Sequence, residues 1–303
     1  MRNAFIDELT AIAELDDKIF LVVGDLGFGV IENFEKKFPG QFLNAGVAEQ
    51  NMMGMAAGLA SAGYKVFVYS IGNFPVFRCL EQIRNDVCYH QLNVSIVSIG
   101  AGLSYGTLGY SHHTVEDIGV MNALPGITIY SPADASETRA ALRASLSVET
   151  PKYFRLGKSG EPNLFNSSPS QFPRWSNLNQ GKQMLVLTTG AVAIEAKEAA
   201  KILRVQGIEI AVYAIPILKP MTIEKELIEQ FQNILIVEEH SASGGLGSII
   251  SEQIALNCHN VKIVKLALPD DVYNELGSQK YLRRYFGIDS VGIANKVREI
   301  LKN

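Results

Sequence analysis

Cysteine is scarce in this sequence, and positive charge is not in excess. The chain has 3 cysteines among 303 residues. Cys79, Cys88 and Cys258 form an odd set without Cys-x-x-Cys or Cys/His spacing, so we expect packed thiols in a reducing compartment instead of disulfides or a metal site. A net charge of −4 offers no basic field to a phosphate backbone, so nucleic-acid binding is not expected. Partners should be small molecules or other proteins.

Long apolar segments are also missing. No stretch approaches the roughly 18 apolar residues that a membrane-spanning helix needs. Residues 1–17 place Phe5, Leu9 and Ile12 at helical spacing among acidic side chains, unlike the apolar region of a secretory signal. We therefore expect a cytoplasmic protein without membrane contact. With 47% hydrophobic residues, the chain can fill a large core, as one large domain or, more naturally, as two.

Short β-branched apolar runs alternate with helical patterns along most of the chain. In the first half, strand-like runs lie at 19–25, 64–70, 93–100 and 127–132. Helical stretches between them include residues 77–90 and 134–147. After a break the alternation resumes, with strand-like runs at 184–190, 208–215, 233–240 and 261–268. This alternation is typical of βαβ units around a parallel sheet.

The break between the two alternating regions predicts a domain boundary. Residues 158–182 are rich in Pro, Ser, Asn and Gly and show no periodicity, as expected of a linker. We therefore predict an α/β fold with two domains, each with a mainly parallel sheet flanked by helices. The first domain covers residues 1–165, the linker residues 166–181, and a smaller second domain residues 182–303.

The glycine-rich stretch GDLGFG, residues 24–29, follows a predicted strand. It lacks the G-x-G-x-x-G pattern, and no acidic residue ends a second strand about 20 positions later, which argues against a nicotinamide cofactor. The carboxyl ends of parallel strands nevertheless present side chains to ligands. Asp25 is therefore a candidate site residue.

A second glycine-rich loop, residues 99–117, carries His112 and His113. Adjacent histidines in such a loop offer hydrogen-bonding groups where backbone can approach a ligand closely. They supply no tetrahedral ligand set, so we expect no metal ligands here.

Phe74 and Phe77, at i, i+3 spacing, would by themselves be core residues. Arg155 and Lys158 would by default be solvated charges.

Glu49 interrupts a stretch that is otherwise suited to the interior, FLNAGVAEQNMMGMAAGLASAGYKVFVYS, residues 42–70. Glutamate is seldom buried unless it is paired, so a surface position is the default interpretation. The apolar helical neighbours favour a low-dielectric setting instead.

Taken together, these stretches resemble the C-terminal half of transketolase: its pyrimidine-binding domain followed by its C-terminal domain. Three ordered blocks carry the resemblance, which covers essentially all of the chain. NAGVAEQNMMGMAAGLASAGYKV is similar to the block around the catalytic glutamate, and GYSHHTVEDIGVMNALPGITIYSPADASE to the substrate-histidine loop. ILIVEEHSASGGLGSIISE is similar to the signature of the C-terminal domain. The AEQ triplet is also close to deoxyxylulose-phosphate synthase, and 2-oxo acid dehydrogenase β subunits share the pyrimidine domain.

The resemblance implies thiamine diphosphate as cofactor and assigns roles to the cofactor candidates. Glu49 would hydrogen-bond N1′ of the aminopyrimidine in a low-dielectric setting, so that the cofactor can lose its C2 proton. Phe74 and Phe77 would pack against the aminopyrimidine ring. Asp25, at the carboxyl end of its predicted strand, is also expected to contact the cofactor.

The resemblance also assigns roles toward the sugar substrate. His112 matches the histidine that contacts the sugar, as a catalytic residue, and His113 would extend that edge. Lys158, with Arg155 beside it, falls where the family has a phosphate-binding arginine. The lysine ammonium would bind the phosphate as a single charge, in place of a guanidinium that forms two parallel hydrogen bonds. The family's loop carries an aspartate four residues before the histidine, where this chain has Leu108. That departure implies a substrate that lacks or inverts the hydroxyl read by the aspartate.

The family's diphosphate-binding half has no counterpart in the sequence. Gly24, Asp25 and Asn51 mimic the spacing of its GDG motif and asparagine, but the third motif residue is Leu26. The resemblance therefore implies a separate diphosphate-binding subunit, which would also supply the magnesium ligands, and an α2β2 heterotetramer with a homodimer contact. The expected reaction is transfer of a two-carbon ketol unit from a ketose phosphate to an aldehyde. A decarboxylating synthase and a non-catalytic scaffold subunit are the alternatives.

Overall fold

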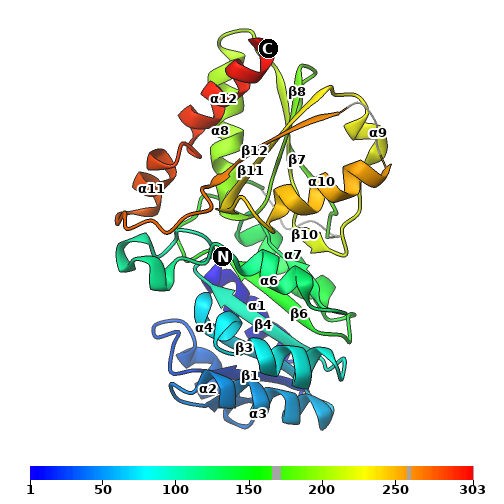
Figure 1. Ribbon diagram of the computed structural model, residues 1–303. Helices are drawn as coiled ribbons and strands as arrows, with labels where there is room; N and C mark the ends of the chain where they lie inside the picture. The colour runs from blue at the N-terminus through cyan, green and yellow to red at the C-terminus, as the bar shows by residue number, and fades with distance from the viewer. Residues whose placement is uncertain (166–171, 258–260, 303) are drawn as a thin grey trace.

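The computed structural model describes residues 1–165, 172–257 and 261–302. These residues build two sheets, one in the lower and one in the upper half of Figure 1, with helices on both faces of each. Both sheets are mostly parallel, which confirms the predicted α/β class with two sheets. No helix in the described ranges is long and apolar enough to cross a membrane.

The first sheet has seven strands in the order β10-β5-β6-β4-β3-β1-β2. Its strands are β1 (Ile19–Val23), β2 (Phe42–Asn44), β3 (Lys65–Ile71), β4 (Val94–Ile99), β5 (Thr128–Tyr130), β6 (Lys152–Leu156) and β10 (Ile217–Lys219). Every residue of β4 and β6 is buried, because helices cover both faces of the sheet. The longer helices around this sheet are α1 (Arg2–Ala13), α3 (Glu49–Ser61), α6 (Asp117–Ala123) and α7 (Ala135–Ser145).

The second sheet has five strands in the order β12-β11-β8-β9-β7. They are β7 (Ser176–Asn179), β8 (Met184–Thr188), β9 (Ile210–Ala214), β11 (Asn233–Ser241) and β12 (Lys262–Leu268). The helices of this half are α8 (Ala193–Arg204), α9 (Lys225–Ile228), α10 (Leu246–Asn257), α11 (Gln279–Tyr285) and α12 (Ser290–Lys302). The buried face of α8, which includes Ala196, Ala199 and Leu203, repeats at helical spacing and packs on the sheet.

The junction of the two halves differs from the predicted linker. Strand β7 lies within residues 166–181 and pairs antiparallel with β9, so part of the expected linker belongs to the second sheet. Strand β10 comes from the second half of the chain yet pairs antiparallel with β5 of the first sheet. Turn-forming composition marks a break in periodicity, but it cannot exclude a short edge strand.

The helix expected over residues 77–90 is interrupted. The chain forms the short helices α4 (Asn73–Phe77) and α5 (Leu80–Gln82), followed by a π-helical segment, η2 (Ile83–Cys88). Cys79 and Cys88 are buried free thiols in this region, as predicted, while Cys258 lies outside the described residues. Short π-helical segments are frequent at functional sites, and this one lies against α3.

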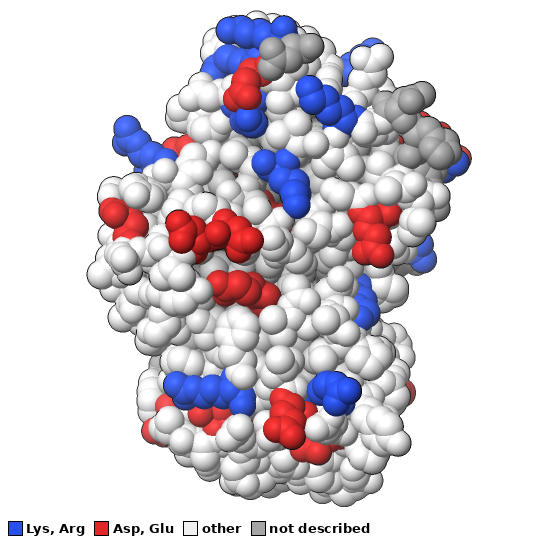
Figure 2. All heavy atoms as spheres, viewed as in Figure 1, with Lys and Arg blue, Asp and Glu red and all other residues white. Residues whose placement is uncertain are grey.

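The two sheets meet through their carboxyl edges. The backbone N–H of Ser241, at the end of β11, donates to the carbonyl of Val115 at 2.7 Å. Val115 belongs to the loop that follows β4. On the face drawn in Figure 2, basic and acidic side chains are interspersed over both halves of the molecule. The fold therefore brings the second half of the chain against the loop that carries the paired histidines.

Candidate functional site

Glu49 is the first residue of α3, directly after the turn that leaves β2. Its side chain is only 6% exposed, and Oε1 accepts a hydrogen bond from Nη1 of Arg78 at 2.8 Å. The helix behind it is apolar, with Met52, Met53 and Ala56 fully buried. The default interpretation as a solvated glutamate is therefore wrong. A buried carboxylate requires such a partner, because desolvation of an unpaired charge is costly.

Aromatic side chains connect Glu49 to the histidine loop, residues 100–116, which carries His112 and His113 between β4 and α6. The guanidinium of Arg78 lies over the ring of Phe74, 4.3 Å from its centroid. The ring of His112 lies on Phe74 edge-on, with centroids 5.4 Å apart. Phe77, on the same short helix, is 40% exposed. The structure thus brings Glu49, Phe74, Phe77 and His112 into one region, although they come from three separate sequence segments.

Two adjoining cavities open at this region and share Arg78. One of about 460 Å³ is lined by residues 47–51 and Arg78. The other, of about 490 Å³, is lined by Asn73, Phe74, Phe77, Arg78, Tyr110, Ser111, His113 and Glu116. Volumes of this size suit a small ligand, and the combination of aromatic walls with a few polar groups is typical of binding sites.

The adjacent histidines have different environments. His112 is half-buried, and its Nδ1 lies 3.0 Å from the hydroxyl of Ser111. The ring of His113 is buried and stacks on Tyr273 of the second half at 6.0 Å. Burial lowers the pKa of His113, so its neutral form is favoured. The ring of His112 is partly accessible beside Phe74 but is not among the residues that line the two cavities, whereas the packed ring of His113 borders the cavity of about 490 Å³.

The side chain of Asn73 fixes the histidine loop to the start of α4. Its Nδ2 donates to the carbonyls of Ser111 and His113, at 3.1 and 2.6 Å. Because Phe74 follows Asn73 directly, the aromatic wall and the histidines keep a defined spacing. Side-chain amides that bond loop backbone in this way replace the regular ladder that an irregular segment lacks.

The expectation that Arg155 binds substrate needs correction. Its side chain is 3% exposed, and Nε donates to Oδ2 of Asp117 at 2.8 Å. Nη2 donates to the carbonyls of Thr114 and Glu239, at 2.9 and 3.0 Å. The guanidinium therefore joins the two halves of the chain inside the protein, where its charge is compensated by Asp117.

Lys158 remains available at the surface. It is exposed, and Nζ lies 5.1 Å from the ring centroid of Tyr105. Tyr105 in turn lies 6.4 Å from the ring of His112. A cation is thus present near the histidine loop, although it comes from the strand end two residues beyond β6.

Asp25 and Leu108 lie at the margins of this region. Asp25 is exposed after β1, with φ of +56°, and exchanges two hydrogen bonds with Asn44, at 3.0 and 3.1 Å. Asn44 ends β2, so Asp25 braces the turn that leads toward Glu49. Leu108 is 54% exposed on the histidine loop and can meet a ligand.

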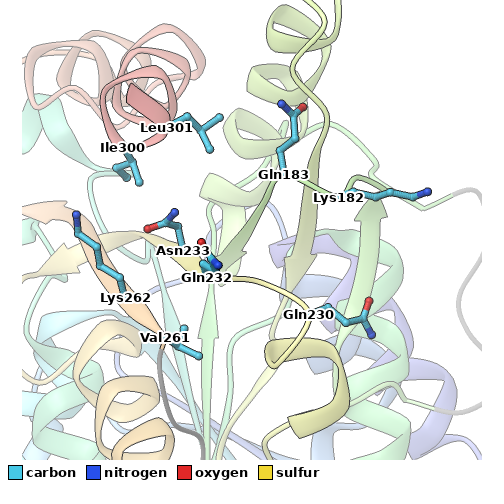
Figure 3. Close-up of a pocket in the computed structure, with 9 residues that line it drawn as sticks. All are labelled: Lys182, Gln183, Gln230, Gln232, Asn233, Val261, Lys262, Ile300 and Leu301. Carbon is cyan, nitrogen blue, oxygen red and sulfur yellow. The ribbon is translucent and has the colours of Figure 1, made fainter. Parts of the chain in front are cut away.

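A cavity of about 1060 Å³ lies elsewhere, at the amino ends of β8, β11 and β12. Ligands of parallel sheets bind at the carboxyl ends. Figure 3 shows Lys182 and Lys262 on opposite sides of this cavity. Its other lining residues are Gln183, Gln230, Gln232, Asn233, Val261, Ile300 and Leu301. It offers no group comparable to the buried Glu49, and we place the functional site at the smaller cavities.

Sequence reasoning missed Arg78 and the contribution of the second half. Arg78 lies one helical turn after Phe74, and the requirement of a buried glutamate for a cation could have drawn attention to it. Tyr273 carried no such signal, because a lone aromatic residue in an irregular segment is compatible with many positions. Among the described residues, no group of three or more His, Cys, Asp or Glu side chains is arranged to hold a metal ion.

Comparison with known proteins gives concordant matches over both halves. The model of the transketolase pyrimidine binding domain matches residues 1–162, and that of the transketolase C-terminal domain matches residues 174–293. One subunit of the apulose-4-phosphate transketolase of Phocaeicola vulgatus is 34% identical, over 99% of this chain and 97% of its own. The 1-deoxy-D-xylulose-5-phosphate synthase of Magnetococcus marinus is 33% identical over 99% of this chain but only 49% of its own. A solved structure of a split gene transketolase, described as an inactive β4 tetramer, has a TM-score of 0.87 and 33% identity, covering 99% of this chain and 97% of its own.

Proposed function

This chain belongs to the transketolase family, and from that membership we propose that it is the C-terminal, pyrimidine-binding subunit of a split transketolase. The observation that carries the proposal is the buried Glu49, which lines one cavity, beside the adjoining cavity walled by Phe74; the two cavities share Arg78. The 34% identity to one subunit of the apulose-4-phosphate transketolase of Phocaeicola vulgatus supports the split arrangement.

The residues at the site fit the aminopyrimidine of thiamine diphosphate. A carboxylate that is buried yet lines a cavity suits a ring nitrogen that shares a proton. In the adjoining cavity, Phe74 and Phe77 offer flat apolar contact. Glu49 would hold the proton at N1′, and Arg78 would have to yield its present hydrogen bond. When bound, the cofactor supplies the carbanion chemistry for carbon–carbon bond cleavage and formation.

His112 and Lys158 would act on the sugar. His112 is half-buried beside Phe74 and would donate or accept a proton at the carbonyl or hydroxyl oxygen of the substrate, which typically contributes about 10²–10⁴-fold to the rate. Lys158 would attract an anionic tail such as a phosphate. The exposed Leu108 offers no hydrogen bond, so we propose a ketose or aldehyde that lacks or inverts one hydroxyl at that point.

The proposed assembly is an α2β2 heterotetramer. A separate diphosphate-binding subunit would supply the magnesium ligands and close the cofactor site, and two copies of this chain would contact one another. The division into a first domain of residues 1–165 and a second domain of residues 182–303 belongs to the same proposal, with β7 of the intervening segment joined to the second sheet. A decarboxylating synthase remains the second candidate, favoured by the 33% identity to the synthase of Magnetococcus marinus. It would release carbon dioxide from pyruvate, which a ketol transferase does not.

The decisive experiment compares this chain alone with the complex formed after adding the product of a neighbouring gene for a diphosphate-binding subunit. Hydrogen–deuterium exchange at cofactor C2 and transfer of a two-carbon unit to aldehydes are measured in both. We expect both activities only in the complex. Full activity of the isolated chain would overturn the split-subunit proposal.

Glu49→Gln tests the site within that complex. The variant should abolish exchange at cofactor C2, because an amide cannot share the proton at N1′, while the far-ultraviolet spectrum stays the same. Glu81→Gln, an exposed glutamate on the neighbouring α5, is the matched control and should exchange like the unmodified complex. Normal exchange in Glu49→Gln would remove this residue from its proposed role.

A further inference from the structure

The base of the histidine loop, residues 100–116, is held by a side chain from the other half of the protein. Glu239, buried near the end of β11, accepts a hydrogen bond at Oε1 from the backbone N–H of Leu103 at 2.6 Å. The approach is close: a Cβ added to Gly102 would lie 2.6 Å from Cγ of Glu239. With φ of +62°, Gly102 also adopts backbone that disfavours other residues. Glycine at this point therefore permits the contact.

Glu239 is itself fixed by two residues of α11. Nε and Nη2 of Arg283 donate to its Oε2, at 2.8 and 2.6 Å, a geometry typical of strong charge-assisted pairs. Nε2 of Gln279 donates to Oε1 at 2.8 Å and also reaches the hydroxyl of Ser104 at 3.2 Å. Gln279 thus links the carboxylate directly to a second loop residue.

Apolar packing supports the same contact. Leu103 and Val115, near the two ends of the histidine loop, are fully buried and share a small core with residues of the second half. The members from that half are Leu268, Leu282 and Ile288. The inner side of the loop therefore belongs to the interface between the halves, while Leu108 and His112 lie on its accessible side.

We propose that Glu239, oriented by Gln279, is a positioning residue for His112. The inference rests on the proposed function and assigns the second half of the chain a part in it. The carboxylate fixes Leu103, and the loop runs from there to His112 without regular secondary structure other than two short 3₁₀ turns. Displacements near 1 Å at a reacting group can cost about 10²-fold in rate. Loss of this anchor should therefore impair sugar chemistry while leaving the Glu49 region intact.

The first measurement uses the full chain without partner or cofactor. Amide hydrogen exchange of Leu103 reports its hydrogen bond to Glu239. Glu239→Asp shortens the side chain, so that one carboxylate cannot reach both Leu103 and Arg283, and the exchange rate should rise about tenfold or more. Gln279→Ala should give a smaller rise. Lys280→Ala, exposed on the same helix, is the matched control and should not change it.

The second measurement uses the assembled complex. In Glu239→Asp and in Gln279→Ala we expect kcat/KM for ketol transfer to fall about tenfold to a hundredfold, with exchange at cofactor C2 within about twofold of normal. Unchanged ketol transfer in both variants would overturn the inference. An equal loss of ketol transfer and of exchange at cofactor C2 would also overturn it, because a merely structural role predicts equal losses. If the unmodified complex shows no exchange at C2, the proposed function fails first and takes the inference with it. If the unmodified complex shows exchange at C2 but the variants do not give the expected selective loss of transfer, only the positioning role is refuted.

Discussion

Glu137 lies buried on α7, where the two halves of the chain join. Its Oε2 accepts the backbone N–H of Ala133 at 2.7 Å, and the hydroxyl of Ser176 donates to Oε1. Within the described residues no cation pairs with it. Burial, with a smaller contribution from the nearby Asp134, raises the pKa of Glu137 from 4.5 to about 7. Below about pH 7 the folded protein therefore favours the neutral acid at this position.

A raised pKa in the folded state makes stability fall as pH rises. The contribution of Glu137 is complete below about pH 4.5, where both states are protonated, and is lost by the time the pH has passed through about 7. At about 1.4 kcal/mol for each pKa unit, the shift from 4.5 to about 7 corresponds to about 3 kcal/mol. Glu137→Gln imitates the neutral acid at every pH, because its amide can accept from Ala133 and donate to Ser176.

The free energy of unfolding, measured in urea, should therefore change differently with pH in wild type and in Glu137→Gln. Between pH 4.5 and 8 the variant should gain about 3 kcal/mol relative to wild type. Trp175, the only tryptophan, gives the signal, because it precedes Ser176 and its Nε1 donates to the carbonyl of Thr222 at 2.9 Å. Glu299→Gln, exposed on α12, is the control and should follow wild type. If Glu137→Gln and wild type change in parallel over this pH range, the burial argument is refuted.

Three further outcomes are expected. Arg155→Ala leaves Asp117 as an unpaired buried charge and should lower the free energy of unfolding by about 3–5 kcal/mol; a loss below about 1 kcal/mol would show that the ion pair is dispensable. Leu108→Asp restores a hydroxyl-reading carboxylate, so in the assembled complex kcat/KM for hydroxylated sugars relative to their deoxy counterparts should rise about fivefold to a hundredfold, and an unchanged ratio would contradict the loop assignment. Limited proteolysis should cut first within residues 158–182, and earlier cleavage within residues 1–157 or 183–303 would argue against the domain division.

The sequence by itself determined the class of fold and the neighbourhood of Glu49. The hydrophobic periods of strands and helices are local features of the sequence, so they can be recognised without knowing which elements pack together. The motif around Glu49 likewise places a carboxylate at the start of an apolar helix, and α3 begins at that residue. Such features depend on residues that are close in sequence.

Tertiary structure decided which charged and aromatic groups meet. Glu49 pairs with Arg78, 29 residues away, and Glu239 bonds Leu103, 136 residues away. Arg155 resembles a surface cation in sequence, yet the approach of the second half encloses it beside Asp117. Desolvation and pairing depend on every segment that excludes water from a site, and no local pattern contains that information.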